Sequence, residues 1–402
     1  MSAANPLGQQ QNVAAPPALM TTYGRQAIAF ARGDGCYLID NNGKRYLDAV
    51  GGIAVNSLGH SHPGFIAAIR EQVGTLVHTS NIYEIPLQSQ LAAELCLRSG
   101  MQQAFFCNSG AESIEASIKL ARKRAYQQGI SNGIILVTDG AFHGRTLGAL
   151  AATHSAKYQE GFGPLPAGFL RVPYNDVPAM TAAIKANANI IAIMVEPIQG
   201  EGGVLQPAAT YLPALRALCD QHDLLLILDE VQTGNGRTGR YFAYQHSGVL
   251  PDILATAKGL GNGFPIGVCL AAGKAAGIFQ PGHHGSTFGG SPLACRAALA
   301  VYEALNKEDL VGNAARIGRY LLEGLRAALK NCNKVREIRG LGLLIGVELD
   351  RPCKELVERA RAQGLLINVT ADTVIRLVPP LTLSQSEADV IIRVVSQLVQ
   401  EL

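Results

Sequence analysis

Short runs of apolar residues alternate with helical stretches in the middle of the chain, and this alternation constrains the fold more than any other feature. The apolar runs cover 134–137, 190–195 and 224–228, and the helical stretches include 111–126 and 209–221. Strands that are apolar along their whole length are buried on both faces, as in a parallel sheet with helices on each side. The sequence therefore predicts an α/β fold built on a mostly parallel sheet.

A second unit of mixed helices and strands is predicted towards the C-terminus. It comprises a long helical region at 301–331, strands at 343–348 and 374–378, a helix at 353–363 and a last helix from about residue 385. This order lacks the regular strand–helix alternation of the middle of the chain, so it indicates a separate α+β unit.

The N-terminal residues are predicted to form an arm followed by a hairpin. Residues 1–20 contain a run of glutamines, and we expect a mobile arm there, with order beginning near Ile28. Two extended pieces, 35–40 and 45–48, flank the sequence Asn41-Asn42-Gly43. A turn of this composition between two apolar pieces is typical of a β-hairpin.

The length of the chain indicates more than one domain. It has 402 residues, whereas a domain usually has about 150. We expect 1–60 to form the arm and part of a small domain, 61–300 a large domain, and 301–402 the C-terminal small α+β domain. Because 48% of the residues are hydrophobic and only 16% are charged, the chain can bury a large core and is not a disordered protein.

Charge and cysteine content limit the partners and the compartment. The net charge is +3 without a cluster of basic residues, so we expect neither nucleic acid nor a membrane surface as a partner. The eight cysteines show no C-x-x-C spacing, which favours free thiols in a reducing compartment. We find no signal or transit peptide and no stretch of membrane-spanning length. These features predict a soluble cytoplasmic protein that acts on small molecules.

A candidate anion site lies where an apolar strand, Phe105-Phe106-Cys107, meets a helix. Ser109 and Glu112 form a capping-box pattern, and Gly110 allows close approach to the backbone. The N–H groups of such a first helical turn favour a phosphate. An ordinary capped helix is the commoner meaning of this pattern.

Acidic and glycine-rich sequences follow the strand that ends near Leu228. In open α/β sheets ligands lie beyond the carboxyl ends of the strands, so Asp229 could hold a positively charged nitrogen there. A helix cap or a metal-bound aspartate remains an alternative. The sequence at 234–239 matches the dinucleotide pattern G-x-G-x-x-G, but it opens no periodic helix, and we reject it as a cofactor loop.

Three basic residues have neighbours that favour a catalytic or ligand-binding role. Lys258 adjoins a glycine-rich, apolar loop, and burial would lower its pKa and make it nucleophilic, although a solvated loop lysine is the alternative. Arg145 lies three residues after Phe142, and Arg376 interrupts an apolar strand. Each could bind a carboxylate, and structural salt bridges are the alternative. The sequence His60-Ser61-His62 lacks further ligands, so we predict no metal site.

The order of these signals resembles the class III branch of the pyridoxal-phosphate (PLP) aminotransferases, from about Ile28 to the C-terminus. The matching segments are 108–112, 142–146, 195–203, 229–234, 257–259 and 285–290. Within the branch, segments 51–60 and 338–346 are similar to the acetylornithine aminotransferase group. The sequence departs from the family pattern at Ser291 and Ile114, where asparagine is frequent.

The resemblance implies a fold-type I PLP transferase, with 61–300 as the PLP-binding domain. Lys258 would hold the cofactor as a Schiff base and shuttle the proton, while Asp229 would pair with the pyridine nitrogen and maintain the electron sink. The other residues implied to bind the cofactor are Phe142 and Val231 on the ring faces, Gln232 at the phenolic oxygen, and Ser109, Gly110 and Ala111 at the phosphate. Ser286 and Thr287 would reach the site of a partner subunit, where Ser286 would contact the substrate and Thr287 the cofactor, which implies a homodimer.

The resemblance also implies the substrates. The ω-amino group of N2-acetylornithine would move to 2-oxoglutarate, giving N-acetylglutamate 5-semialdehyde and glutamate, in arginine metabolism. We expect Arg145 to bind the distal carboxylate of both substrates and Arg376 to bind the carboxylate beside the ketone. Glu201 is the candidate that masks Arg376 when the ω-amino donor is bound, although a permanent ion pair is a competing interpretation.

Other functions are weighed against this one. A nicotinamide oxidoreductase depends only on the rejected glycine pattern at 234–239. A binding protein without catalysis would be expected to lose Lys258 or Asp229, and both are present. Succinylornithine, ornithine and 4-aminobutyrate aminotransferases are alternatives that share the cofactor.

Overall fold

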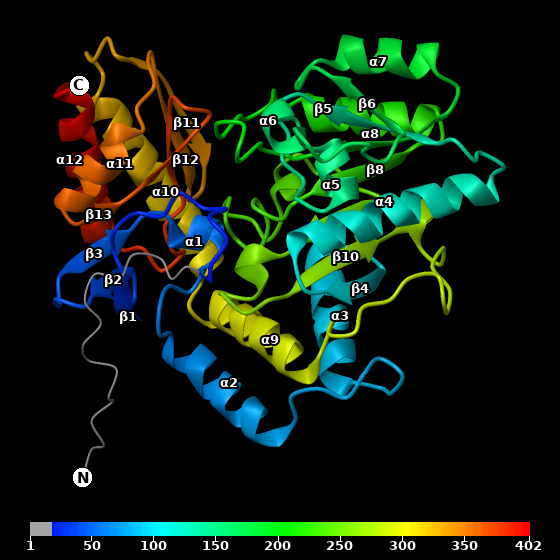
Figure 1. Ribbon diagram of the computed structural model, residues 1–402, viewed down its shortest axis with the longest axis horizontal. Coiled ribbons are helices and arrows are strands. Elements are labelled where there is room, and N and C mark those ends of the chain that lie inside the picture. The colour runs from blue at the N-terminus through cyan, green and yellow to red at the C-terminus, as the bar shows by residue number, and fades with distance from the viewer. Residues whose placement is uncertain (1–17) are drawn as a thin grey trace.

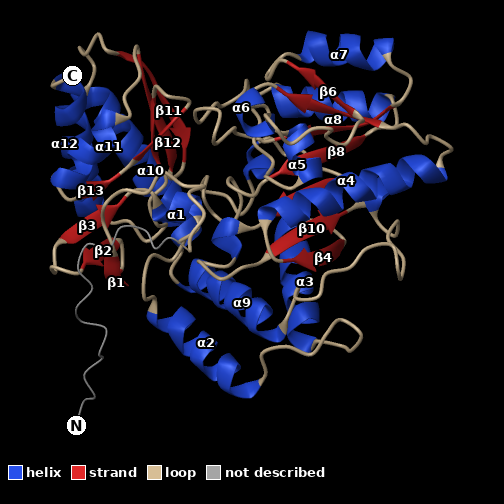
Figure 2. Ribbon diagram, viewed as in Figure 1, coloured by secondary structure: helices blue, strands red, loops and turns tan. Residues whose placement is uncertain are grey.

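The chain forms a central sheet flanked by helices, beside a second group of strands and helices (Figures 1 and 2). This computed structural model describes residues 18–402, so almost all of the arm predicted at 1–20 lies outside the described residues. In the described part of the chain, no helix is long and apolar enough to cross a membrane.

The central sheet has seven strands in the order β4-β10-β9-β8-β7-β5-β6. The strands are β4 (Gln103–Cys107), β5 (Ile134–Thr138), β6 (Phe169–Val172), β7 (Ile190–Val195), β8 (Leu225–Asp229), β9 (Ile253–Thr256) and β10 (Gly267–Ala271). Only β10 is antiparallel to its neighbours, β4 and β9, whereas the other pairs are parallel. All residues of β7 to β10 are buried, which confirms the prediction of a mostly parallel sheet buried on both faces.

Helices cover both faces of this sheet. One face packs against α4 (Gly110–Gln127) and α5 (Leu147–Ala152). The other face is covered by α3 (Pro86–Ser99), α7 (Val177–Ala186), α8 (Tyr211–Gln221) and α9 (Pro292–Lys307). Along β8, Leu225 and Ile227 contact the first set of helices, and Leu226 and Leu228 contact the second. This alternation explains why the strand is apolar at every position.

The remaining strands form two four-stranded sheets, in the orders β1-β2-β3-β13 and β11-β12-β15-β14. They are β1 (Phe30–Asp34), β2 (Tyr37–Asp40), β3 (Arg45–Asp48), β11 (Val335–Leu341), β12 (Leu344–Leu349), β13 (Leu365–Leu366), β14 (Asn368–Thr370) and β15 (Val374–Leu377). The helices beside them are α10 (Leu310–Ala328), α11 (Glu355–Ala362) and α12 (Gln385–Gln400). Strands β2 and β3 are antiparallel, which confirms the predicted hairpin.

Short elements complete the chain: α1 (Gly51–Ala54), α2 (Pro63–Thr75), α6 (Ala156–Gln159) and the 3-10 turns η1 (Ala243–His246), η2 (Lys258–Leu260) and η3 (Gly273–Ala275). Turn η2 carries the candidate catalytic lysine directly after β9. The carboxyl end of a sheet strand therefore positions this residue.

The predicted helical region 301–331 consists of two helices. Helix α9 begins earlier, at Pro292, and ends at Lys307, and α10 begins at Leu310. Between them Asp309 has φ of +50°, a left-handed conformation that a right-handed helix cannot include. Residues 308–309 are Glu-Asp, so no helix-breaking proline or glycine marks the end of the first helix.

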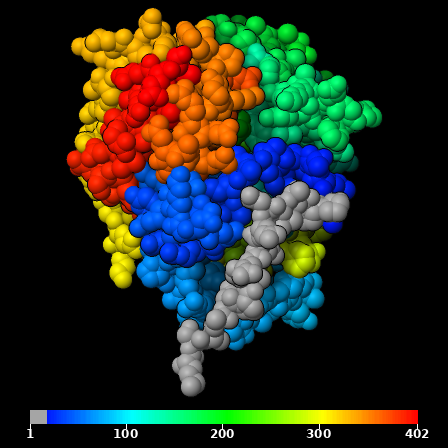
Figure 3. Space-filling model, turned by 60° about the vertical axis from the view of Figure 1, so that its left-hand side comes forward, coloured from blue at the N-terminus to red at the C-terminus, as the bar shows by residue number. Residues whose placement is uncertain are grey.

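The N-terminal strands share a hydrophobic core with the C-terminal elements. Leu47 and Leu58 belong to the same cluster of buried residues as α10 and α12. The N–H of Val378 donates to the carbonyl of Ala49 (2.8 Å), directly after β15. Figure 3 shows the blue N-terminal segment against the orange and red C-terminal elements. This packing holds residues 49–58 beside the strand that carries Arg376.

Candidate active site

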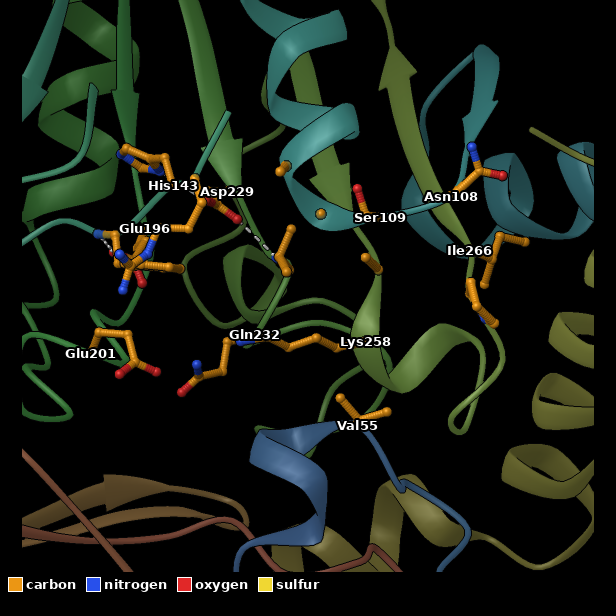
Figure 4. A pocket seen from close by; sticks show the side chains of 18 of the residues that line it. Val55, Asn108, Ser109, His143, Glu196, Glu201, Asp229, Gln232, Lys258 and Ile266 are labelled. Atoms are coloured by element: carbon orange, nitrogen blue, oxygen red, sulfur yellow. Dashed lines mark hydrogen bonds and ion pairs between the residues drawn. The ribbon is translucent and has the colours of Figure 1, made fainter. Parts of the chain in front are cut away.

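A pocket of about 400 Å³ lies beyond the carboxyl ends of the parallel strands. Figure 4 shows Gln232 between Glu201 and Lys258, with Val55 below the lysine. The predicted site residues that line the pocket are Ser109, Gly110, Ala111, Phe142, Arg145, Glu201, Asp229, Val231, Gln232 and Lys258. Arg376, Ser286 and Thr287 do not line it.

The first turn of α4 forms one wall of this pocket. Ser109 is the N-cap, and its Oγ accepts a hydrogen bond from the N–H of Glu112 (3.2 Å). The Glu112 carboxylate in turn accepts from the N–H of Asn108 (2.7 Å). A Cβ at Gly110 would lie 2.7 Å from the Val231 side chain, so only glycine fits there. The N–H groups at residues 110 and 111 have no preceding helical carbonyl and suit an anion.

Asp229 is buried at the end of β8 and has a fixed orientation. One carboxylate oxygen accepts from the N–H of Val231 (3.0 Å), and the other lies 2.7 Å from Nδ1 of His143. The His143 side chain is fully buried, and its Nε2 has no partner among the described residues. This geometry presents a carboxylate oriented by a histidine to the pocket, where it can stabilise a positively charged nitrogen.

Glu196 is a second buried carboxylate of the pocket. Its two oxygens accept from the N–H of Phe142 (2.9 Å) and the N–H of Gly200 (3.1 Å). Burial, together with the charge of Asp229, raises the pKa of Glu196 to about 7. Through these two hydrogen bonds, the Glu196 carboxylate links the backbone of Phe142 to the loop that carries Glu201.

Lys258 projects into the pocket from η2. Burial lowers the pKa of its ammonium group, while the carboxylate of Glu201 opposes this effect. A lysine with a lowered pKa is a better nucleophile and base, because more of its amine is neutral. The position in the pocket favours the chemical interpretation of this residue over that of a solvated loop lysine.

Arg145 and Arg376 have different surroundings. The exposed Arg145 guanidinium lies 3.6 Å from the centre of the Tyr158 ring, and within the described residues no carboxylate lies within 4.0 Å of it. Arg376 is 0% exposed, and its Nη1 donates to Glu201 (2.5 Å) and Gln232 (3.2 Å). Its Nη2 is buried without a partner among the described residues.

Glu201 separates Arg376 from the pocket, because Glu201 lines the pocket and Arg376 does not. Burial by itself raises the pKa of Glu201, but the charge and hydrogen bond of Arg376 outweigh it and the pKa lies below its usual value. The carboxylate is therefore held in its charged form, as an ion pair with the arginine behind it.

Within the described residues, Ser286, but not Thr287, forms a hydrogen bond with a residue that lines the pocket of its own chain. The hydroxyl of Ser286 accepts from Nδ2 of Asn108 (3.2 Å), and Asn108 lines the pocket. Thr287 is exposed and does not reach the pocket of this chain.

Comparisons with known proteins identify the family. The sequence model described as "Aminotransferase class-III" matches residues 20–399. The chain belongs to the class-III aminotransferases. This aminotransferase is 51% identical over 384 residues to acetylornithine aminotransferase 1 of Bordetella pertussis, covering 96% of this chain and 98% of the relative. It is also 51% identical over 381 residues to the acetylornithine aminotransferase of Nitrosomonas europaea, covering 95% and 97%.

Solved structures of aminotransferases share the fold. The ornithine aminotransferase of Toxoplasma gondii superposes with a TM-score of 0.92 at 34% identity, covering 96% of this chain and 93% of that one. The acetylornithine aminotransferase of Elizabethkingia anophelis gives a TM-score of 0.85 at 32% identity, covering 95% and 96%. Another structure of the Toxoplasma protein is described with partial occupancy of PLP at the active site. These likenesses confirm the predicted fold-type I architecture.

Class-III aminotransferases are PLP enzymes, and the residues of this aminotransferase fit that cofactor. The first turn of α4 suits a phosphate, because Ser109, Gly110 and Ala111 line the pocket and the N–H groups of a first helical turn favour anions. The buried Asp229 suits a protonated ring nitrogen, and the amine of Lys258 suits an aldehyde.

Sequence reasoning gave no role to His143 or Glu196. Both belong to segments that were singled out, 142–146 and 195–203. Both segments contain other polar residues, so no local signal marks these two side chains, and only the fold shows that both lie near Asp229.

The two departures from the family pattern serve local packing in this aminotransferase. Ser291 caps α9, where its Oγ accepts from the N–H of Ala294 (3.4 Å). Ile114 is fully buried between α4 and the sheet. Neither residue lines the pocket.

Proposed function

We propose that this class-III aminotransferase transfers the ω-amino group of N2-acetylornithine to 2-oxoglutarate, giving N-acetylglutamate 5-semialdehyde and glutamate in arginine biosynthesis. The observation that carries the proposal is a single pocket that holds Lys258, with Arg145 at its edge and Arg376 behind Glu201. The names of relatives at 51% identity support the same donor. We also propose a cytoplasmic location, which the eight free cysteines support.

Lys258 is proposed to hold the cofactor and to move the proton. When bound, PLP supplies an electron sink that stabilises negative charge on the substrate carbon. In the half-reaction with the donor, Nζ of Lys258 takes the proton from the carbon that bears the amino group. In the half-reaction with 2-oxoglutarate, it gives a proton to the former keto carbon. Burial favours this role because it lowers the pKa of the amine.

Asp229 is proposed to keep a proton on the ring nitrogen, with His143 as its positioning residue. The 2.7 Å contact with His143 and the N–H of Val231 restrict both carboxylate oxygens. Phe142 and Val231 both line the pocket and are assigned to the two ring faces, with Gln232 at the phenolic oxygen. Ser109, Gly110 and Ala111 are assigned to the phosphate.

The substrates differ in the number of carboxylates that the pocket must bind. N2-acetylornithine has one carboxylate, far from its ω-amine, whereas 2-oxoglutarate has one at each end. We assign the distal carboxylate of both to Arg145. Arg376 is assigned to the carboxylate beside the ketone, and Glu201 masks it while the ω-amino donor is bound. The unpartnered Nη2 of Arg376 supports this assignment, because a bound carboxylate would satisfy it.

A panel of ω-amino donors tests the proposed function. With 2-oxoglutarate as acceptor, kcat/KM for N2-acetylornithine is expected to exceed that for 4-aminobutyrate by at least about 100-fold, a difference of about 2.7 kcal/mol. The acetylated amine of N2-acetylornithine supplies contacts that 4-aminobutyrate lacks, and the carboxylate of 4-aminobutyrate lies one carbon closer to its ω-amine. If succinylornithine, ornithine or 4-aminobutyrate gives the highest kcat/KM, the donor assignment is wrong.

We further propose a homodimer in which Ser286 and Thr287 reach the partner's site. An exposed apolar patch supports this, since Ile82, Tyr83 and Phe288 are 80%, 66% and 63% exposed. These residues are contiguous, because the side chain of Asn81 donates to the carbonyls of Ser286 and Gly289. Apolar patches of this kind mark protein interfaces.

Mixing two inactive variants tests the shared site. Lys258→Ala lacks the lysine, and Thr287→Glu puts a negative charge where the phosphate of the partner's cofactor is expected. Random exchange of subunits is expected to restore about a quarter of wild-type activity, because half of the dimers contain one intact site. No recovery, with exchange verified by mass spectrometry of the intact dimers, contradicts the proposal.

A further inference from the structure

The backbone at Lys258 has a conformation that its surroundings must enforce. Lys258 has φ of +44°, in the left-handed region that residues other than glycine rarely adopt. The preceding Ala257 has φ of −166° and ψ of −137°, outside the regular helix and strand regions. A residue other than glycine is strained in the left-handed region and stays there only when its surroundings hold it. Contacts to residues 256–258 therefore set the position and direction of the Cα–Cβ bond of Lys258.

Asn235 makes the side-chain contacts that hold this segment. It is only 1% exposed, and its Nδ2 donates to Oγ1 of Thr256 (2.9 Å) and to the carbonyl of Ala257 (3.2 Å). The other end of the amide, Oδ1, accepts from the hydroxyl of Tyr302 (3.3 Å). Both amide hydrogens thus bind the two residues that precede Lys258, while only the amide oxygen contacts α9.

The loop that presents Asn235 is itself rigid. A Cβ at Gly234 would lie 2.8 Å from the carbonyl of Glu230, and Gly236 has φ of +91°. The buried Arg237 donates to the carbonyls of Leu343 and Pro379. The glycine pattern at 234–239 therefore serves close packing behind the site, which explains why it matches the dinucleotide motif without being one.

We propose that Asn235 is a positioning residue for Lys258, setting the direction in which the lysine enters the pocket. The inference rests on the proposed function, because it assigns Lys258 the proton transfer in both halves of the reaction. A lysine displaced by a fraction of an ångström still bonds to the cofactor but transfers protons more slowly, since transfer rates depend steeply on geometry. Substrate contacts at Arg145 and Arg376 are untouched.

The test uses the holoenzyme of Asn235→Gly, because glycine accepts the left-handed φ of +56° at this position while removing the amide. Borohydride reduction followed by mass spectrometry counts the chains whose Lys258 is bonded to PLP. We expect labelling close to that of the wild type, kcat per labelled site about tenfold lower, and both KM values within twofold. Single-turnover rates with the amino donor and with glutamate should fall by the same factor.

Tyr302→Phe is the matched control. It removes the hydrogen bond at the other end of the same buried amide but leaves the contacts to Thr256 and Ala257 intact. Its kcat per labelled site is expected to stay within twofold of the wild type. The inference is overturned if Asn235→Gly keeps wild-type kcat per labelled site, or if Tyr302→Phe loses as much.

Two further outcomes separate the possible causes of failure. If Asn235→Gly does not fold, Thr256→Val replaces it and is expected to lower kcat per labelled site about threefold, again equally in both half-reactions; an unchanged kcat overturns the inference. If the wild-type protein is labelled at a lysine other than Lys258, the proposed function is wrong and not only this inference.

Discussion

Lys258→Ala is expected to lower turnover by at least about 10³-fold, the largest effect of any single substitution in this chain. The variant loses the amine that holds the cofactor and the group that moves the proton, and no other lysine lines the pocket in the described part of the chain. The measurement is the single-turnover rate with each substrate, together with borohydride labelling of the wild type. We expect label only in the peptide that contains Lys258.

Lys274→Ala is the matched control for this substitution. Lys274 is also partly buried in a 3-10 turn after a sheet strand, but its Nζ donates to the carbonyls of Cys219 and Leu224, away from the pocket. Its removal is expected to leave turnover within twofold and to affect only stability. Labelling at Lys274, or substantial turnover by Lys258→Ala, would refute the assignment.

Glu201→Ala is expected to slow the half-reaction with the ω-amino donor far more than the half-reaction with glutamate. Without the carboxylate, the buried Arg376 guanidinium is unpaired and competes for the single carboxylate of the ω-amino donor. Removing one partner of a buried charge pair typically costs at least about 2 kcal/mol, or roughly 30-fold. The rate constant of the half-reaction with N2-acetylornithine should fall by about this factor. The glutamate half-reaction should stay within about threefold, because the substrate carboxylate replaces Glu201.

Stopped-flow measurement of each half-reaction checks this expectation, and Arg376→Lys supplies the opposite control. Lysine keeps the charge but loses the planar two-nitrogen contact, so glutamate and 2-oxoglutarate should be affected more than the ω-amino donor. Equal losses in both half-reactions for Glu201→Ala would show that the ion pair is permanent and that no gate exists.

The sequence by itself determined the features that depend on neighbouring residues. The apolar runs at 134–137, 190–195 and 224–228 are strands buried on both faces, because a strand covered on each side must be apolar at every position. The capping pattern at Ser109 and Glu112 starts α4 as predicted. The place of Asp229 at the carboxyl end of a buried strand follows from the same local pattern.

Only the tertiary structure decided which distant side chains meet and in what orientation. Glu201 and Arg376 are 175 residues apart, and His143 and Asp229 are 86 residues apart. The periodicity of a sequence reports the burial of a face but carries no information on the partner across it. For the same reason Asn235 lay in a discarded motif, although it binds the residues before Lys258. The chain thus encodes its elements locally, whereas the position and charge of each site residue depend on contacts that exist only after the sheets have packed.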